Sequence, residues 1–276
     1  MTISDGNLNL VEEVLARDGA IAAAIIEPSG ASWGRVPLEV EFLRGLREIT
    51  QRHGVLLIFD EVVTGFRFSP GGAQQLYDVL PDLTCLAKIL AGGMPGGAVV
   101  GRTDVMQLFD RSGDPHRDRH GRVTHFGTFN ASPTSAAAGI ALLKKVATGG
   151  ASQRADAMAA KLRAAWSDVL ERKGIAGFVY GPSSTFHVYF ETDRERLAGT
   201  NDLDDLRTTD ASRLKGMPEP LLTQYARLLR FYGVDFLSST GGVVSTAHTD
   251  GDIEHATWAF EKTVVALAEG GLVYLL

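Results

Sequence analysis

The chain has 276 residues, of which 45% are hydrophobic and 22% are charged, and its formal net charge at pH 7 is −6. This length and apolar content predict a globular protein with a substantial buried core, built as one large domain or two modest ones. The acidic balance argues against nucleic acid and anionic membranes as partners, because both require a predominantly basic surface, so we expect a small-molecule ligand.

The sequence predicts neither a membrane span nor a targeting segment. No apolar stretch approaches the roughly 20 residues of a membrane helix, and the first six residues, MTISDG, lack the basic and apolar regions of a signal peptide. We therefore expect a cytoplasmic protein with no membrane partner. The single cysteine, Cys85, excludes an intrachain disulfide and a cysteine-rich metal site, and its apolar neighbours predict a thiol in the core.

Apolar runs and an amphipathic segment alternate early in the chain. Residues 21–26 form a short apolar run, apolar residues recur at helical spacing over 38–49, and residues 55–59 form a second apolar run. This pattern predicts a β-α-β unit in a parallel sheet that is covered by helices, because the runs are apolar on both faces. Asp60 then lies at the carboxyl end of a strand, where open α/β sheets bind their ligands.

Two further strands are expected at residues 83–87 and 98–100, joined by a connection rich in glycine. Lys88 lies where the first of these strands meets that connection. Residues 110–122 mix arginine and aspartate whose charges largely cancel, so we expect a solvated loop there. The nearby histidines, His116, His120 and His125, have no acidic or cysteine partner at ligand spacing, and no metal site is predicted.

The sequence pattern of the C-terminal half predicts a smaller α/β domain. Alanine-rich sequence with apolar repeats over 135–173 predicts two consecutive helices that are interrupted at Gly149-Gly150. Residues 186–190 alternate like a strand, residues 201–216 are polar and are expected to be rich in loops, and residues 219–232 have helical periodicity. We place the domain boundary near Gly149-Gly150.

Asp60 and Lys88 are the candidate pair for catalysis. A buried amine can form a Schiff base with the aldehyde of pyridoxal phosphate, and a buried carboxylate can hold a proton on the pyridine nitrogen so that the ring withdraws electrons. Simpler interpretations stay open for each residue taken alone. Asp60 and Glu61 could cap a helix or a turn after a core strand, and the Lys88 amine could simply reach solvent.

An apolar run that ends in Asp-Glu is also typical of the strand that holds magnesium in nucleotide hydrolases. A hydrolase built around Asp60 and Glu61 is therefore a remote alternative. Such an enzyme needs a phosphate-binding loop of the form G-x-x-x-x-G-K-[ST], and neither Gly-Lys-Ser nor Gly-Lys-Thr occurs anywhere in the sequence.

Three segments, in this order and spacing, resemble the class III aminotransferases: DEVVTGFR from Asp60, PDLTCLAK ending at Lys88, and GTFNASP from Gly127. Further motifs most closely resemble glutamate-1-semialdehyde 2,1-aminomutase and its relatives: EP at 27–28, GGAQ at 71–74 and AHT at 247–249. The resemblance implies an α/β fold of the fold-type I class. Residues 1–150 would be the later part of the large domain that binds pyridoxal phosphate, with a mainly parallel sheet covered by helices, and residues 151–276 the small C-terminal α/β domain.

The resemblance also implies roles for individual residues. Lys88 would be the catalytic Schiff-base lysine that moves protons, and Asp60 the catalytic partner of the pyridinium nitrogen. Val62 would pack on the pyridine ring, and Thr128 would donate its hydroxyl to the phosphate, in the family from across a dimer interface. From the residues alone, Val62 could equally be a core residue and Thr128 a helix cap. The implied substrate is an amino acid or an amine.

The resemblance implies that the chain begins at a point well inside the large domain of the family. In the family, the preceding portion supplies a helix start that cradles the phosphate, an aromatic residue stacked on the ring and most substrate contacts. We therefore expect weakened cofactor binding, exposed apolar sheet surface, and either a homodimer or a complementing N-terminal chain. The alternative function is a catalytically incomplete remnant or assembly partner of such an enzyme.

Overall fold

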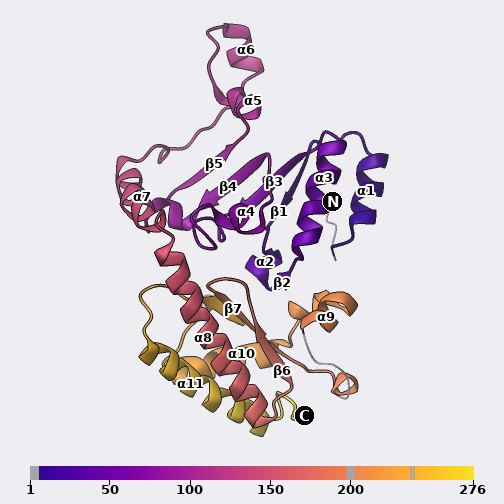
Figure 1. Ribbon diagram of the computed structural model, residues 1–276, viewed down its shortest axis with the longest axis vertical. Helices are drawn as coiled ribbons and strands as arrows, with labels where there is room; N and C mark the ends of the chain where they lie inside the picture. The colour runs from indigo at the N-terminus through magenta and orange to yellow at the C-terminus, as the bar shows by residue number, and fades with distance from the viewer. Residues whose placement is uncertain (1–5, 198–202, 237, 239) are drawn as a thin grey trace. The chain divides into compact units, whose positions relative to one another are not determined.

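The computed structural model describes residues 6–197, 203–236, 238 and 240–276, and its chain divides into two compact units (Figure 1). Unit 1 comprises Met1–Pro28 and Leu38–Gly149, and unit 2 comprises Ser29–Pro37 and Gly150–Leu276. The first five residues, on which part of the signal-peptide argument rests, lie outside the described residues, as do residues 201–202 of the predicted polar loop. None of the described helices has the length and apolar character needed to cross a bilayer.

Unit 1 is built on a four-stranded sheet with the order β1-β3-β4-β5. The strands are β1 (Ala23–Ile26), β3 (Leu56–Glu61), β4 (Leu83–Ala87) and β5 (Gly97–Gly101). The first three are parallel, and the predicted β-α-β unit is confirmed because α3 (Val40–Arg52) lies between β1 and β3 in the chain. β5 runs antiparallel to β4. The connection between them is shorter than the crossover that a parallel pair requires.

Helices cover one face of this sheet. Leu57 and Phe59 of β3 are fully buried and pack in a cluster with residues of α3 and of α1 (Leu8–Arg17). We call the opposite face the open sheet face. It carries residues that are aligned across the four strands: Ile25, Ile58, Asp60, Leu83, Cys85 and Val99. Burial on both faces, predicted from the apolar runs, is not observed at β1, because the side chain of Ile25 is 64% exposed.

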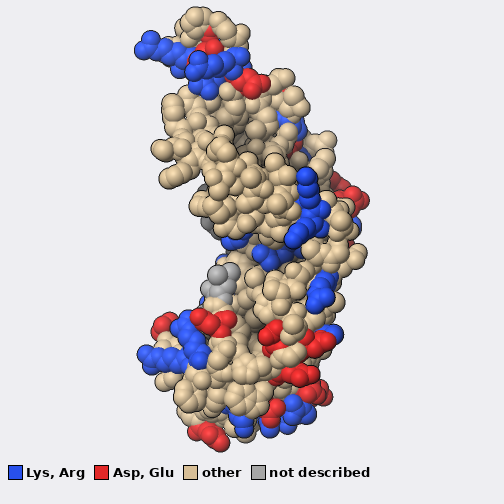
Figure 2. Space-filling view, turned by 90° about the vertical axis from the view of Figure 1, so that its left-hand side faces the viewer, with Lys and Arg blue, Asp and Glu red and all other residues tan. Residues whose placement is uncertain are grey.

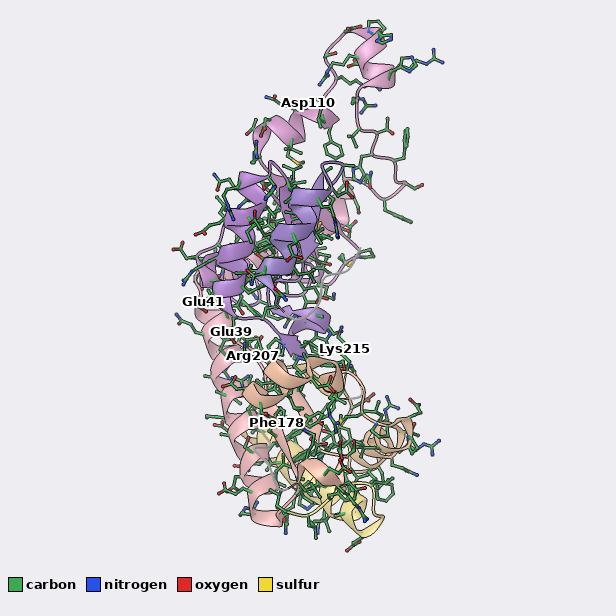
Figure 3. All side chains as sticks on the ribbon, turned by 90° about the vertical axis from the view of Figure 1, so that its right-hand side faces the viewer. Glu39, Glu41, Asp110, Phe178, Arg207 and Lys215 are labelled. Carbon is green, nitrogen blue, oxygen red and sulfur yellow. The ribbon has the colours of Figure 1, made fainter. Side chains whose placement is uncertain are left out.

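The remaining helices of unit 1 follow in chain order: α4 (Gly72–Tyr77), η1 (Lys88–Ala91), α5 (Thr103–Met106), η2 (Gln107–Phe109), α6 (Pro115–His120) and α7 (Pro133–Val146). α6 lies in an arm beyond Asp110 that was predicted to be a loop (Figure 3). The helix forms there because the side chain of Asp114 accepts a hydrogen bond from the backbone N–H of His116, at 2.9 Å, and Pro115 suits the first helical position.

Unit 2 contains an antiparallel sheet with the order β6-β7-β8. Its elements in chain order are α2 (Ala31–Gly34), β2 (Val36–Pro37), α8 (Gly150–Lys173), β6 (Gly177–Tyr180), β7 (Thr185–Phe190), η3 (Arg194–Arg196), α9 (Leu203–Thr209), η4 (Ala211–Leu214), α10 (Glu219–Phe231), β8 (Gly241–Val243) and α11 (Asp250–Glu269). The two predicted consecutive helices, α7 and α8, are confirmed, with Gly149 between them at φ +77°. The polar stretch predicted to be rich in loops contains α9 and η4.

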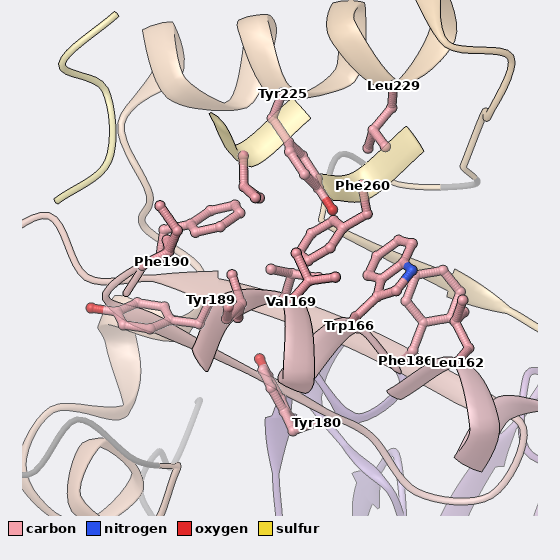
Figure 4. Packing of buried hydrophobic residues seen from close by; sticks show 14 of the residues in the cluster. Leu162, Trp166, Val169, Tyr180, Phe186, Tyr189, Phe190, Tyr225, Leu229 and Phe260 are labelled. Carbon is pink, nitrogen blue, oxygen red and sulfur yellow. The ribbon is translucent and has the colours of Figure 1, made fainter. Parts of the chain in front are cut away.

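Aromatic side chains fill the core of unit 2 (Figure 4). The ring of Trp166 stacks on that of Phe260 at 4.1 Å, and Tyr225 meets Phe260 edge to face. Residues 29–37 join this unit, although the preceding and following residues belong to unit 1. The Trp33 ring lies 4.9 Å from that of His187, and the Tyr180 hydroxyl donates a 2.6 Å hydrogen bond to the carbonyl of Arg35.

Candidate functional site

Asp60 lies near the carboxyl end of β3, on the open sheet face. It is half-buried, and its carboxylate oxygen Oδ1 accepts a 3.1 Å hydrogen bond from the backbone N–H of Val62. Its other oxygen, Oδ2, accepts no hydrogen bond from a described residue. The strand end therefore presents an oriented carboxylate with one acceptor oxygen available to a ligand.

Lys88 directly follows β4, at the first position of η1. Its backbone is left-handed, with φ +51°, a conformation that costs a non-glycine residue about 1–3 kcal/mol and is enriched at functional sites. The side chain is exposed rather than buried as the amine was expected to be, and its ammonium forms no ion pair with a described residue. The strand ends because the chain turns sharply here into a 3-10 helix.

The sheet brings Asp60 and Lys88 to the same edge. Asp60 is aligned with Cys85 on the adjacent parallel strand, and Lys88 follows Cys85 by three positions, or about 10 Å along the strand direction. Val62 lies in the turn that follows β3, where it is half-buried. These three predicted site residues thus share one edge of unit 1.

Thr128 comes from a different segment of unit 1. It is exposed in the connection between α6 and α7, and its neighbours Phe129 and Asn130 line a cavity of about 640 Å³ that also borders η1 and α7. No hydrogen bond links its hydroxyl to Asp60 or Lys88. Within one chain, Thr128 therefore makes no direct contact of this kind with the two predicted catalytic residues.

Glu61 was considered in the sequence only as a partner of Asp60, but it points to the opposite, helix-covered face. Its carboxylate is fully buried and accepts four hydrogen bonds. The donors are the hydroxyl of Thr64 at 2.9 Å, the backbone N–H of Ala73 at 2.6 Å, and the backbone and side-chain N–H groups of Gln74, both at 3.1 Å. Strand alternation could have revealed the opposed faces, but not these partners.

The opposed directions of the two carboxylates do not suit a shared magnesium ion, which argues against the hydrolase alternative. Among the described residues, no three His, Cys, Asp or Glu side chains are grouped so that they could hold a metal. A cavity of about 550 Å³ borders Gln74 and Leu86. Leu86 is aligned with Glu61, so this cavity lies on the covered side of the sheet, away from Asp60.

Cys85 is half-exposed on the open sheet face, so the prediction of a core thiol is wrong. Burial raises the pKa of the thiol, and the nearby negative charge of Asp60 raises it further. Cys85 also lies beside Asp60, three positions before Lys88, and was not singled out as a site residue from the sequence.

Comparisons with known proteins agree with the motifs. The family model described as "Aminotransferase class-III" matches residues 5–181. Glutamate-1-semialdehyde 2,1-aminomutase 2 of Brevibacillus brevis is 37% identical over 236 residues, which are 85% of this chain and 50% of that protein. The chain therefore spans about half the length of this relative.

Two solved structures show the same fold. An omega-transaminase from Sphaerobacter thermophilus superposes with a TM-score of 0.81 at 31% identity, over 95% of this chain and 56% of that one. A structure described as "Transaminase with PLP bound" superposes with a TM-score of 0.79 at 30% identity, over 97% of this chain and 58% of that one. The predicted fold-type I α/β architecture is thereby confirmed.

Proposed function

This chain belongs to the class III aminotransferases, and from that premise we propose that it serves amino-group transfer dependent on pyridoxal phosphate. The reaction is that of an aminotransferase, or of an aminomutase similar to glutamate-1-semialdehyde 2,1-aminomutase, acting on an amino acid or an amine. The observation that carries the proposal is the placement of Asp60 and Lys88 at one edge of the sheet, where the Asp60 Oδ2 atom and the Lys88 amine have no partner among the described residues.

The residues present fit two groups of pyridoxal phosphate. The available oxygen of Asp60 suits the protonated nitrogen of a pyridine ring, because a carboxylate stabilises a nearby cation. The amine of Lys88, which forms no ion pair with a described residue, suits the aldehyde, with which a primary amine condenses. The open sheet face carries Cys85 beside Asp60, and Val62 flanks Asp60, so the surface available to a ring is largely apolar. When bound, the cofactor supplies a ring that withdraws electrons from the carbon bearing the amino group.

Asp60, Val62 and Lys88 each have a separate task in the proposed mechanism. The carboxylate of Asp60 holds a proton on the ring nitrogen, and the Val62 N–H keeps that carboxylate oriented. With the cofactor bound, the Nζ atom of Lys88 would act as the base that takes a proton from the carbon bearing the substrate amino group and as the acid that returns it to the product. Val62 excludes water from one face of the ring.

We further propose a cytoplasmic homodimer in which Thr128 binds the phosphate held by the partner subunit. Large apolar side chains near Thr128 and on α7 support an interface, since Phe126 is 87%, Phe129 84% and Ile140 57% exposed. The visible surface of unit 1 below the α6 arm also carries few charged side chains (Figure 2). A complementing N-terminal chain is the other assembly that would cover apolar surface, on the open sheet face.

Trapping the cofactor tests the proposed function. Purified protein is mixed with pyridoxal phosphate, its visible spectrum is recorded, the mixture is reduced with borohydride, and the modified residue is mapped by mass spectrometry. We expect the label on Lys88, its loss in Lys88→Arg, and its retention in Lys144→Arg, which alters an exposed lysine of α7. A folded protein without label at Lys88 would favour the catalytically incomplete remnant.

A further inference from the structure

The last residue of β3, Glu61, has a buried carboxylate with no cation beside it among the described residues. Glu61 forms no ion pair with a described residue, and its charge is balanced by oriented dipoles alone. Two of its four donors are backbone N–H groups at the start of α4, from Ala73 and Gln74, where helical amides point outward and favour an anion. Hydrogen bonds to a charged acceptor are the stronger kind, so this set of contacts is a rigid connection.

The surrounding backbone is shaped to this carboxylate. Gly72 has φ +75°, and a Cβ atom built on it would overlap the carboxylate of Glu61. The side-chain amide of Gln74 also donates to the hydroxyl of Thr84 on β4, at 3.3 Å. Burial raises the pKa of Tyr77 to about 12, and the charge of Glu61 contributes to that rise. Glu61 thus connects β3 to α4 and, through Gln74, to β4.

The same residue closes the turn that follows β3. The carbonyl of Glu61 accepts a 2.9 Å hydrogen bond from the N–H of Gly65, and its carboxylate accepts one from the hydroxyl of Thr64. Val62 lies inside this turn, and its N–H is the group that donates to Asp60. A displacement of the turn would therefore move the donor that orients the Asp60 carboxylate on the opposite face.

We propose that Glu61 is a positioning residue, which holds the turn of residues 61–65 against α4 and thereby fixes the Asp60 carboxylate on the open sheet face. Glu61 touches neither cofactor nor substrate in this arrangement, and it acts through Val62. The inference rests on the proposed function for its effect on the cofactor. Its structural part, the control of the turn, can be measured without any cofactor.

The first test compares Glu61→Gln with Asp82→Asn in the full chain. The glutamine keeps the shape of the side chain but turns one acceptor oxygen into a donor that faces other donors. Asp82 is the matched control, because it is another buried carboxylate of this sheet, at the opposite end of β4, and it is bound by Arg47, Arg102 and the N–H of Leu57. We expect Glu61→Gln to speed amide hydrogen exchange over residues 62–66 by about tenfold or more, and Asp82→Asn to leave it unchanged there.

A second measurement uses the cofactor. Glu61→Gln should weaken pyridoxal phosphate binding and shift the pH dependence of the visible absorbance of the Lys88 adduct, whereas Asp82→Asn should lower thermal stability without that spectral shift. If Glu61→Gln does not fold, Thr64→Val removes one donor while preserving shape and should change exchange and spectrum in the same direction, to a smaller extent.

Two results would overturn the inference: wild-type exchange over residues 62–66 in the folded Glu61→Gln or Thr64→Val variant, or equal acceleration in Asp82→Asn. A wild-type protein that takes no label at Lys88 instead contradicts the proposed function. In that case the exchange data still decide whether Glu61 holds the turn that carries the Asp60 contact.

Discussion

Asp60 on β3 and Cys85 on β4 are aligned partners of a parallel strand pair, so their side chains emerge next to each other on the open sheet face. This neighbourhood has a chemical consequence, because burial and then the Asp60 charge raise the pKa of the thiol. Cys85 is the single cysteine of the chain. It is therefore a specific probe of the charge and occupancy of this part of the sheet.

Alkylation of Cys85 should depend on Asp60. A raised pKa means less thiolate at a given pH, so we expect iodoacetamide to react more slowly with the folded protein than with the unfolded chain at pH 8. Asp60→Asn removes the negative charge, lowers the thiol pKa and should speed the reaction. Rates at several pH values, followed by mass spectrometry, measure the effect. Identical alkylation rates in the folded wild-type protein and in folded Asp60→Asn would show that the charge of Asp60 does not affect the pKa of the thiol.

Asp60→Asn should separate cofactor attachment from turnover. The asparagine oxygen can still accept from Val62, but it no longer stabilises a positive ring nitrogen. We expect borohydride to label Lys88 as before, while amino-group transfer falls by about 10²–10³-fold. Asp110→Asn, on an exposed residue beside the α6 arm, is the control. Full activity in Asp60→Asn would contradict the assigned role.

Because of Asp82, the free energy of unfolding should fall as the pH is lowered into the acid range. Although burial by itself acts to raise it, the pKa of Asp82 is lowered overall by donation from Leu57 and by Arg102 and Arg47. A lowered folded-state pKa means that this stabilisation is present above the unfolded pKa and is lost as pH falls through the folded one. We expect Asp82→Asn to cost about 3 kcal/mol at pH 7 and progressively less in acid, as measured by urea unfolding at several pH values. An equal cost at every pH would contradict this prediction.

Gly72 and Gly54 offer a matched comparison of two glycines with positive φ, +75° and +67°. A Cβ atom at Gly72 would overlap the Glu61 carboxylate, whereas at Gly54 it would meet no atom within 4 Å. Gly54→Ala should cost about 1 kcal/mol for the backbone alone, and Gly72→Ala about 1–3 kcal/mol more because Glu61 must move. Thermal unfolding of both variants measures the difference in stability. Equal losses of stability would mean that the Glu61 side chain can move aside without a measurable cost.

The proposed dimer depends on the exposed apolar side chains near Thr128. Phe129→Asp should convert a dimer into a monomer, because a charge placed in an apolar interface is left unpaired. Leu80→Asp is the control, since Leu80 is 74% exposed elsewhere in unit 1. Light scattering coupled to gel filtration gives the mass. If the wild-type protein is a monomer, the homodimer proposal is wrong. If Phe129→Asp is still a dimer, the interface lies elsewhere on the chain.

The positions of Asp60 and Lys88 at strand ends were predictable from the sequence. Apolar runs of strand length before each residue, and the helical periodicity between the first two runs, are local signals that the parallel pairs of β1, β3 and β4 confirm. The break between α7 and α8 was equally local, because Gly149 adopts a backbone that other residues rarely take. The roles of Asp60, Val62, Lys88 and Thr128 in catalysis stay predictions.

Other features were decided by tertiary structure alone. The carboxylate of Glu61 accepts hydrogen bonds from Ala73 and Gln74, which lie beyond the turn that follows β3. Residues 29–37 join unit 2 through contacts such as that of Trp33 with His187, 154 positions away. Local periodicity carries no information about such pairs, because they form when separate elements fold together. The sequence by itself thus determined which residues end the strands, whereas packing decided what each of them touches and how exposed Lys88 and Cys85 are.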